Sequence, residues 1–140
     1  MLYDKKVNIY KKNQLPKIID KSKPIFIYLI ETRVYCYSRK MYINLYKIGQ
    51  TRKHPLSRFK NYSNNYNAVY IKPIYIYKST MSDTEVIKQM NCELIKYKIM
   101  TKNGGWTREF FMINNICIKK FVDVLNNIYS TKIYEKMDDT

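Results

Sequence analysis

The feature that most constrains the fold is a run of strand-forming side chains at residues 25–37 (IFIYLIETRVYCY). β-branched and aromatic residues dominate it, and its first half is apolar on both faces, which predicts a strand. Residues 38–40 supply a turn, and residues 42–48 predict a second strand. The two strands are expected to form an antiparallel hairpin.

The second strand runs into the segment 46–51 (YKIGQT), which holds Gly49, one of only three glycines in the chain. Glycine tolerates positive φ and lets another backbone or a phosphate approach closely. A helix is predicted over residues 55–62, because Pro55 suits a first-turn position. It carries Arg58, seven residues beyond Thr51. A strand that ends at a glycine and leads into a helix is a candidate site at a surface pocket.

Three further elements are predicted downstream. Residues 68–77 read as a third strand, in which Pro73 indicates an edge position or a bulge. Residues 82–98 read as a long helix. Its apolar residues recur at helical spacing: Val86, Met90, Leu94 and Tyr97. After a turn at residues 103–105, residues 106–113 contain a short apolar segment.

A last helix is expected to begin at Asn114 or Asn115. Its predicted buried stripe consists of Cys117, Phe121, Val124 and Ile128. The order is β-β-α-β-α-(β)-α. It predicts an α+β fold with a small antiparallel three-stranded sheet flanked by helices, with residues 25–130 as one domain and residues 131–140 as a C-terminal tail.

The net charge of +15 is extreme for 140 residues and favours a polyanionic partner, with nucleic acid as the default. A/T-rich coding bias explains part of the lysine content, but the positive field exists whatever its origin. Residues 1–24 carry seven lysines and read as a basic arm. Such an arm can follow a phosphate backbone or be a solvated terminus.

No apolar run approaches the ~18 residues that span a bilayer, so no membrane segment is predicted. No hydrophobic core of a secretory signal occurs near the N-terminus. The three cysteines show no CxxC spacing, which predicts reduced thiols rather than disulfides or zinc. Together these features predict an intracellular protein.

Acidic residues are scarce, so their positions are informative. Divalent-metal phosphate chemistry needs a carboxylate ligand and cations that stabilise the phosphate. Glu85 with Arg58 could supply that pair. Glu85 also fits a capping box that begins at Ser82, in which its carboxylate would only satisfy a backbone N–H. Arg58 also fits a solvated helix face. His54, the only histidine, belongs to no catalytic motif.

Taken together, five segments resemble the GIY-YIG nuclease superfamily, and most closely its viral and phage branch called T5orf172 or MUG113. In chain order these segments are Phe26-Ile27-Tyr28, Lys47-Ile48-Gly49, Arg58 with Tyr62, Glu85, and Arg108-Glu109-Phe110-Phe111. The resemblance covers roughly residues 25–125 and suits a gene of a large DNA virus or a mobile element.

The resemblance implies an endonuclease that hydrolyses phosphodiester bonds of DNA by a one-metal mechanism with Mg²⁺ or Mn²⁺. It implies that Tyr28 helps to activate the attacking water and that Tyr62 is a further catalytic candidate. Arg58 would neutralise charge on the scissile phosphate, and Glu85 would hold the metal. Lys47 would stand in the place of the second family tyrosine, with Tyr46 covering part of that role.

Two departures from the family pattern are Phe26, in the place of the GIY glycine, and Gln89, in the place of a histidine. Second-line candidates are Glu109, His54 and Glu93, the last as a fallback metal ligand. The basic residues expected to contact DNA are Arg52, Lys53, Lys60 and Arg108. Two alternatives remain open: a catalytically inactive module that binds nucleic acid, and a basic domain that binds an acidic protein.

Overall fold

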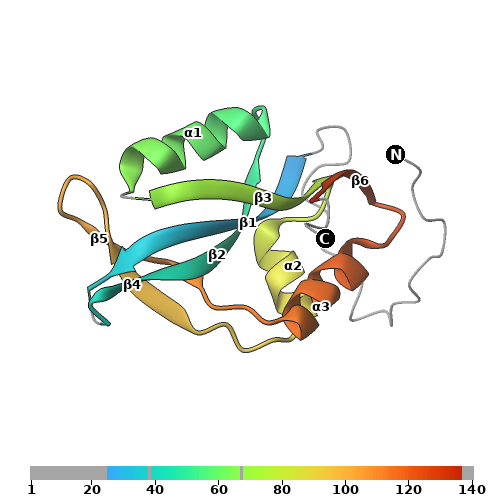
Figure 1. Cartoon of the computed structure of the whole chain (residues 1–140). Helices are drawn as coiled ribbons and strands as arrows, with labels where there is room; N and C mark the ends of the chain where they lie inside the picture. The colour runs from blue at the N-terminus through green and yellow to red at the C-terminus, as the bar shows by residue number, and fades with distance from the viewer. Residues whose placement is uncertain (1–24, 38, 67, 137–140) are drawn as a thin grey trace.

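The computed structural model describes residues 25–37, 39–66 and 68–136. The basic arm predicted over residues 1–24 lies outside them. Within the described residues, three helices pack on a six-stranded antiparallel sheet with the strand order β4-β5-β2-β1-β3-β6 (Figure 1). The predicted α+β class is confirmed. The predicted number of three strands was wrong, because strands β4, β5 and β6 extend the sheet at both edges.

The centre of the sheet is the predicted hairpin and the third strand. β1 (Ile25–Cys36) pairs with β2 (Met41–Thr51) on one side and with β3 (Ala68–Ser79) on the other. The β1–β2 register is regular and places Tyr28 directly opposite Gly49. Because β1 has a partner on each side, its continuous apolar first half is buried in the middle of the sheet.

Pro73 lies at a bulge, as its position in the third strand predicted. Leu29 is paired with Tyr75 but Ile30 with Pro73, so one residue of β3 is extra at this point. β3 is not an edge strand, because β6 (Ser130–Glu135) pairs with its second half. Residues 131–135 of the predicted C-terminal tail therefore belong to the sheet.

The helix predicted over residues 82–98 was wrong in its second half. α2 (Asp83–Met90) ends at Asn91, whose left-handed backbone (φ 51°) terminates the helix. β4 (Lys96–Met100) follows and pairs with β5 (Trp106–Phe111). The helical spacing of Leu94 and Tyr97 misled the prediction, since the two side chains pack against cores on opposite sides of the sheet.

Helices cover the sheet from both sides (Figure 1). α1 (Pro55–Asn65) packs on one face, and α2 with α3 (Asn115–Leu125) packs on the other. Asn114 caps α3 as expected, but Ile128 follows the helix and is 61% exposed, so it is not part of the buried stripe. No helix in the described part of the chain is long and apolar enough to cross a membrane.

Each face of the sheet has its own apolar core. Alternation along β1 sends Tyr28 and Ile30 toward α1, and Ile27 and Leu29 toward α2 and α3. This alternation decides which polar residues of the central strands can share a site.

Candidate functional site

Tyr28 and Gly49 form the base of the site. Tyr28 is fully buried on the α1 side of the sheet, and its ring lies against the backbone of Gly49. A Cβ at residue 49 would lie 2.6 Å from Tyr28 Cζ and closer still to its hydroxyl. Glycine is thus required here, because the Tyr28 ring lies too close to the backbone to leave room for a Cβ.

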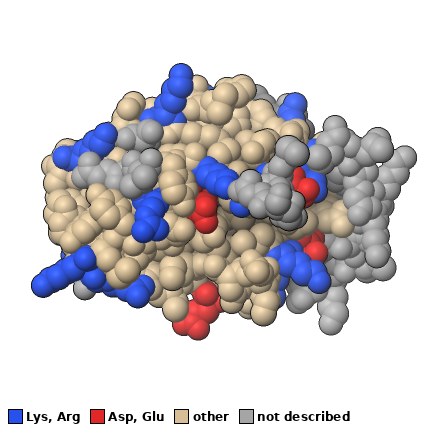
Figure 2. Space-filling view, in the orientation of Figure 1, with Lys and Arg blue, Asp and Glu red and all other residues tan. Residues whose placement is uncertain are grey.

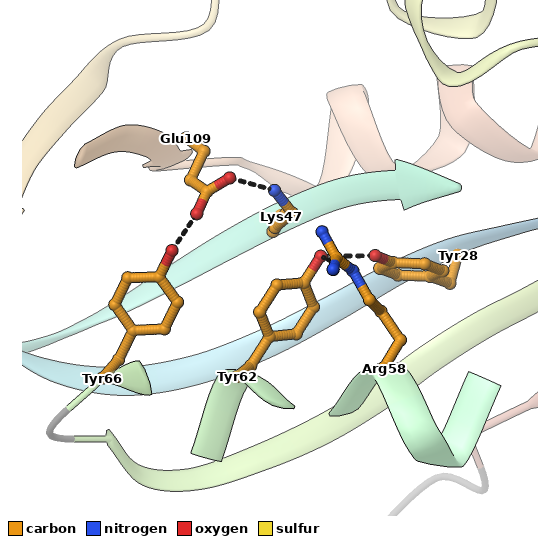
Figure 3. A network of polar contacts seen from close by, with 6 residues as sticks. All are labelled: Tyr28, Lys47, Arg58, Tyr62, Tyr66 and Glu109. Atoms are coloured by element: carbon orange, nitrogen blue, oxygen red, sulfur yellow. Dashed lines mark hydrogen bonds and ion pairs between the residues drawn. The ribbon is translucent and has the colours of Figure 1, made fainter. Parts of the chain in front are cut away.

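α1 adds a second tyrosine and a cation. The hydroxyls of Tyr28 and Tyr62 share a hydrogen bond of 2.5 Å (Figure 3). Arg58, one helical turn before Tyr62, donates from Nε to the Tyr62 hydroxyl at 3.3 Å. Its guanidinium lies 5.0 Å from the centroid of the Tyr62 ring. Tyr62 is buried and Arg58 is exposed, so the guanidinium is the part of this group that solvent reaches.

Both phenols are neutral at pH 7. Burial, reinforced by the neighbouring Tyr62, raises the pKa of Tyr28 well above its ordinary value. Burial also raises the pKa of Tyr62, although the hydrogen bond from Tyr28 and the charge of Arg58 oppose the shift. The pair therefore presents neutral hydroxyls beside a permanent cation.

A second polar group adjoins the first (Figure 3). Lys47 is 8% exposed and forms an ion pair of 2.5 Å with Glu109 of β5. The Tyr66 hydroxyl donates to the other carboxylate oxygen of Glu109. Lys47 Nζ also lies 5.3 Å from the centroid of the Tyr62 ring, which joins the two groups. We call these six residues the polar cluster: Tyr28, Lys47, Arg58, Tyr62, Tyr66 and Glu109.

The ionisation of Glu109 is controlled by its partners. Burial alone raises the pKa of Glu109, but hydrogen bonds from Lys47 and Tyr66 outweigh it and hold this pKa below its ordinary value. Burial and the hydrogen bond to Glu109 raise the pKa of Tyr66 to about 12. At neutral pH Glu109 is thus a carboxylate already occupied by two donors.

Tyr46 does not reach the polar cluster. Consecutive residues of a strand point to opposite faces, so Tyr46 lies on the side of the sheet opposite to Lys47. Its hydroxyl donates to Glu31 Oε2 at 2.8 Å, and Tyr70 donates to Oε1 of the same carboxylate at 3.3 Å. The structure thus gives no support to the expected sharing of the Lys47 role by Tyr46.

Glu85 lies in the first turn of α2, whose cap is only half of the predicted capping box. Ser82 Oγ accepts from Glu85 N at 3.0 Å. The carboxylate of Glu85 instead accepts a hydrogen bond of 3.1 Å from Gln89 Nε2, one turn further along the helix. Gln89, which stands where the resemblance places histidine, therefore orients the glutamate.

One residue connects the start of α2 with a pocket beside α1. Gln50 Oε1 accepts from the backbone N–H of Asp83 at 3.0 Å. Gln50 also lines a pocket of about 320 Å³, together with Thr51, Arg52, Lys53, Ser57, Arg58 and Asn61. Three of these seven side chains are cationic and none is acidic, which suits a phosphate group.

The remaining predicted residues lie around or away from this pocket. His54 is the N-cap of α1, and its Nδ1 accepts from Leu56 N at 3.2 Å, which gives it a structural role. Lys60 is exposed on α1, and Arg108 is exposed on β5 beside Glu109. Glu93 is exposed between α2 and β4.

The described side chains contain no group of three or more histidine, cysteine, aspartate or glutamate residues that could hold a metal ion. A cage of protein ligands is therefore absent from this part of the chain. Mg²⁺ keeps several waters and binds through one or two carboxylates together with substrate phosphates. Glu85 is a single oriented carboxylate of this kind, but α2 packs on the face of the sheet opposite to α1, and Glu85 is not part of the polar cluster. The contact of Gln50 with Asp83 links the start of α2 to the pocket.

Sequence reasoning missed Tyr66 and Gln50. Tyr66 stands four positions after Tyr62, but it is the extended C-cap residue that follows α1, so helical spacing does not explain its place in the site. Gln50 carried no signal of its own, since its contact with Asp83 joins segments 33 residues apart.

Comparison with known protein families finds a match over most of the chain. The model of the T5orf172 domain matches residues 25–128, which include every member of the polar cluster as well as Glu85. No curated protein and no solved structure shows a significant match.

Proposed function

Because this chain belongs to the T5orf172 domain family, which is compatible with a nuclease-like or nucleic-acid-binding function, we propose that it is a metal-dependent DNA endonuclease of the GIY-YIG type. The observation that carries the proposal is the polar cluster beside Gly49. There Tyr28, Lys47 and Arg58 converge from three different elements next to a cationic pocket.

Arg58 is proposed to bind the scissile phosphate. It is exposed and lines the pocket, and a guanidinium can bind two phosphate oxygens at once. The charge that builds on those oxygens in the transition state is stabilised by such a preorganised cation. A shift of Arg58 toward the phosphate also uncovers the Tyr62 hydroxyl that it contacts in the structure.

Tyr28 is proposed to orient the attacking water. Its hydroxyl is buried in this structure, so in this proposal water reaches it once Arg58 has shifted toward the phosphate. As a neutral phenol it would then accept a hydrogen bond from that water while it stays bonded to Tyr62. Lys47 adds positive charge next to the Tyr62 ring, and Glu109 holds Lys47 in place. In this proposal Glu109 positions another residue and does not react.

Glu85 is proposed to hold Mg²⁺ or Mn²⁺, with Gln89 orienting its carboxylate. The bound ion would supply stabilisation of the leaving oxygen. Glu85 suits this role better than Glu109, whose two oxygens are engaged by Lys47 and Tyr66.

The test is cleavage of supercoiled, linear, nicked and branched DNA by the full chain with Mg²⁺ or Mn²⁺. Glu85→Gln is expected to abolish cleavage, and Glu109→Gln only to weaken it. Glu135→Gln is the matched control and should retain full activity, because Glu135 is exposed on β6 and forms only a surface ion pair with Lys132.

Intact DNA with either metal would disprove the endonuclease. If the inert protein still bound DNA with a steep salt dependence, it would be a nucleic-acid-binding module. Absent or salt-insensitive DNA binding would point instead to an acidic protein as the partner.

A further inference from the structure

A chain of aromatic rings lies at the end of β1 away from Tyr28. Tyr42 contacts Tyr35 (ring centroids 5.3 Å apart), Tyr35 contacts Tyr37 (4.8 Å), and Tyr37 contacts Trp106 (6.0 Å). Lys98 Nζ lies 4.8 Å from the centroid of the Trp106 ring. We call these four rings and the lysine the ring cluster.

The ring cluster is open to solvent. Tyr37, Tyr42 and Trp106 are each 45–48% exposed. Tyr35 lies on the same side of β1 as Ile27 and Leu29, by strand alternation. α2 and α3 pack at the Ile27–Leu29 end of this face, so within residues 25–37, 39–66 and 68–136 no helix shields the rings.

Cations, but no acidic groups, are visible around this end of the molecule. Figure 2 shows lysine and arginine side chains along the left edge, where the β1–β2 and β4–β5 hairpins lie in Figure 1, and no acidic side chain there in this view. In the sequence, residues 96–108 hold four basic residues and no acidic one. Exposed aromatic rings can stack with unpaired nucleobases, and the surrounding cations can bind the phosphates that join them. An open antiparallel sheet with both features therefore suits a single-stranded nucleic acid.

We propose that the ring cluster is a binding surface for single-stranded nucleic acid, on which bases stack against Trp106 and Tyr37 while Lys98 contacts the backbone. A fully paired duplex keeps its base faces stacked inside the helix and cannot use these rings. The surface is distinct from the Tyr28 end of the polar cluster: Tyr35 lies seven residues along β1 from Tyr28, about 23 Å at the rise of a strand, and on the opposite face. Glu109 of the polar cluster is nearer, three residues from Trp106 along β5.

The proposal goes beyond the proposed nuclease activity and does not depend on it. If both hold, the chain has one surface for unpaired bases and another for the phosphodiester bond. DNA with a single-stranded branch next to a duplex would then engage both surfaces.

Trp106 allows a direct test, because it is the only tryptophan in the chain and its fluorescence reports on this surface alone. The full chain is titrated with a short oligo(dT), with a duplex of equal length, and with an abasic oligonucleotide of equal length. EDTA is present to prevent cleavage. Oligo(dT) should quench the fluorescence and bind most tightly. The abasic strand keeps the phosphates but lacks the bases, and should bind more weakly without quenching.

Variants are followed by the anisotropy of labelled oligo(dT). Trp106→Ala should weaken binding on the order of 5- to 150-fold, the range measured for loss of one base-stacking ring. Trp106→Phe should restore most of it. The matched control is Tyr134→Ala, which removes a 40% exposed ring from β6 at the far edge of the sheet and should change nothing.

Equal binding of oligo(dT) and the abasic strand, or equal affinity of Trp106→Ala and the parent chain, would overturn the proposal and leave only charge attraction. Failure of the nuclease proposal is a separate result. Glu85→Gln should lose cleavage and keep the binding of oligo(dT).

Discussion

At residue 49, the packing of one ring leaves no room for a side chain. The ring of Tyr28 lies where a Cβ of residue 49 would be, and Tyr28 itself is fully buried and hydrogen-bonded to Tyr62. The ring therefore cannot move aside without disturbing the polar cluster.

We accordingly expect Gly49→Ala to destabilise the protein by about 1–3 kcal/mol, the usual range for overpacking a filled core. DNA cleavage should fall with it, because Tyr28 is displaced. Urea unfolding measures the first effect. Gly105→Ala is the control: the added Cβ would meet the side chains of Thr101 at 3.2 Å and Asn103 at 3.6 Å in an exposed turn, and the change should stay within about 0.5 kcal/mol. Equal stability of the Gly49→Ala and parent proteins would contradict the packing argument.

Glu109 makes stability depend on pH. Its pKa is lowered in the folded state, so its contribution is present above the ordinary value of 4.5 and is lost as the pH falls through the lower folded pKa. Lys47 is nearly buried and would lose its partner if the carboxylate were replaced.

Glu109→Gln should therefore destabilise the protein by about 1–2 kcal/mol at pH 7, a figure kept low because a third of the Glu109 side chain is exposed. The difference from the parent chain should shrink below about pH 4.5 in unfolding curves measured across pH. Glu135→Gln, which breaks the exposed pair with Lys132, should cost less than about 0.5 kcal/mol at any pH. A pH-independent difference for Glu109→Gln would rule out this linkage.

Among the elements, the length of α2 is set by the residues at its two ends. Ser82 caps its start, and Asn91 stops it in the left-handed conformation. Without that stop, the helical spacing of the sequence would continue into the segment that forms β4.

The left-handed conformation disfavours residues with a Cβ, and asparagine tolerates it better than alanine. Asn91→Ala should thus destabilise the protein by about 1 kcal/mol, while Asn91→Gly should be neutral or slightly stabilising. Thermal unfolding of the two variants tests this order. The reverse order would show that the αL stop does not control where α2 ends.

For the whole molecule, the dominant quantity is the charge of +15. Phosphate binding by lysine and arginine releases counterions, so DNA affinity is expected to fall linearly in a plot of log affinity against log salt. The pocket cations lie on one part of this charged surface.

The double variant Arg52→Ala, Lys53→Ala removes two of these cations. If each contacts one phosphate, the slope of log affinity against log salt concentration should become less steep by about two. Anisotropy titrations with a duplex at several salt concentrations measure the slope. Lys119→Ala, an exposed lysine on α3 across the sheet, should leave it unchanged. An unchanged slope in the double variant would place the DNA elsewhere on the protein.

The sequence by itself determined the features that depend on neighbouring residues: the β1–β2 hairpin, the start of α1 at Pro55, the Asn114 cap and the bulge at Pro73. Motif spacing also identified Tyr28, Lys47, Arg58, Tyr62 and Glu85 as candidates. Backbone preferences and helix caps depend on residues a few positions apart, so the local sequence is enough to predict them.

Only the tertiary structure decided what depends on distant partners. β4 and β6 are five and six residues long and are stable because β5 and β3 pair with them. The ion pair between Lys47 and Glu109 joins residues 62 positions apart in the sequence. Lys47 and Tyr46 are neighbours in the sequence but lie on opposite faces of the sheet, so they have different partners. These contacts form because a buried polar side chain needs a hydrogen-bond partner, and the packing of the elements decides which residues lie close enough to be one.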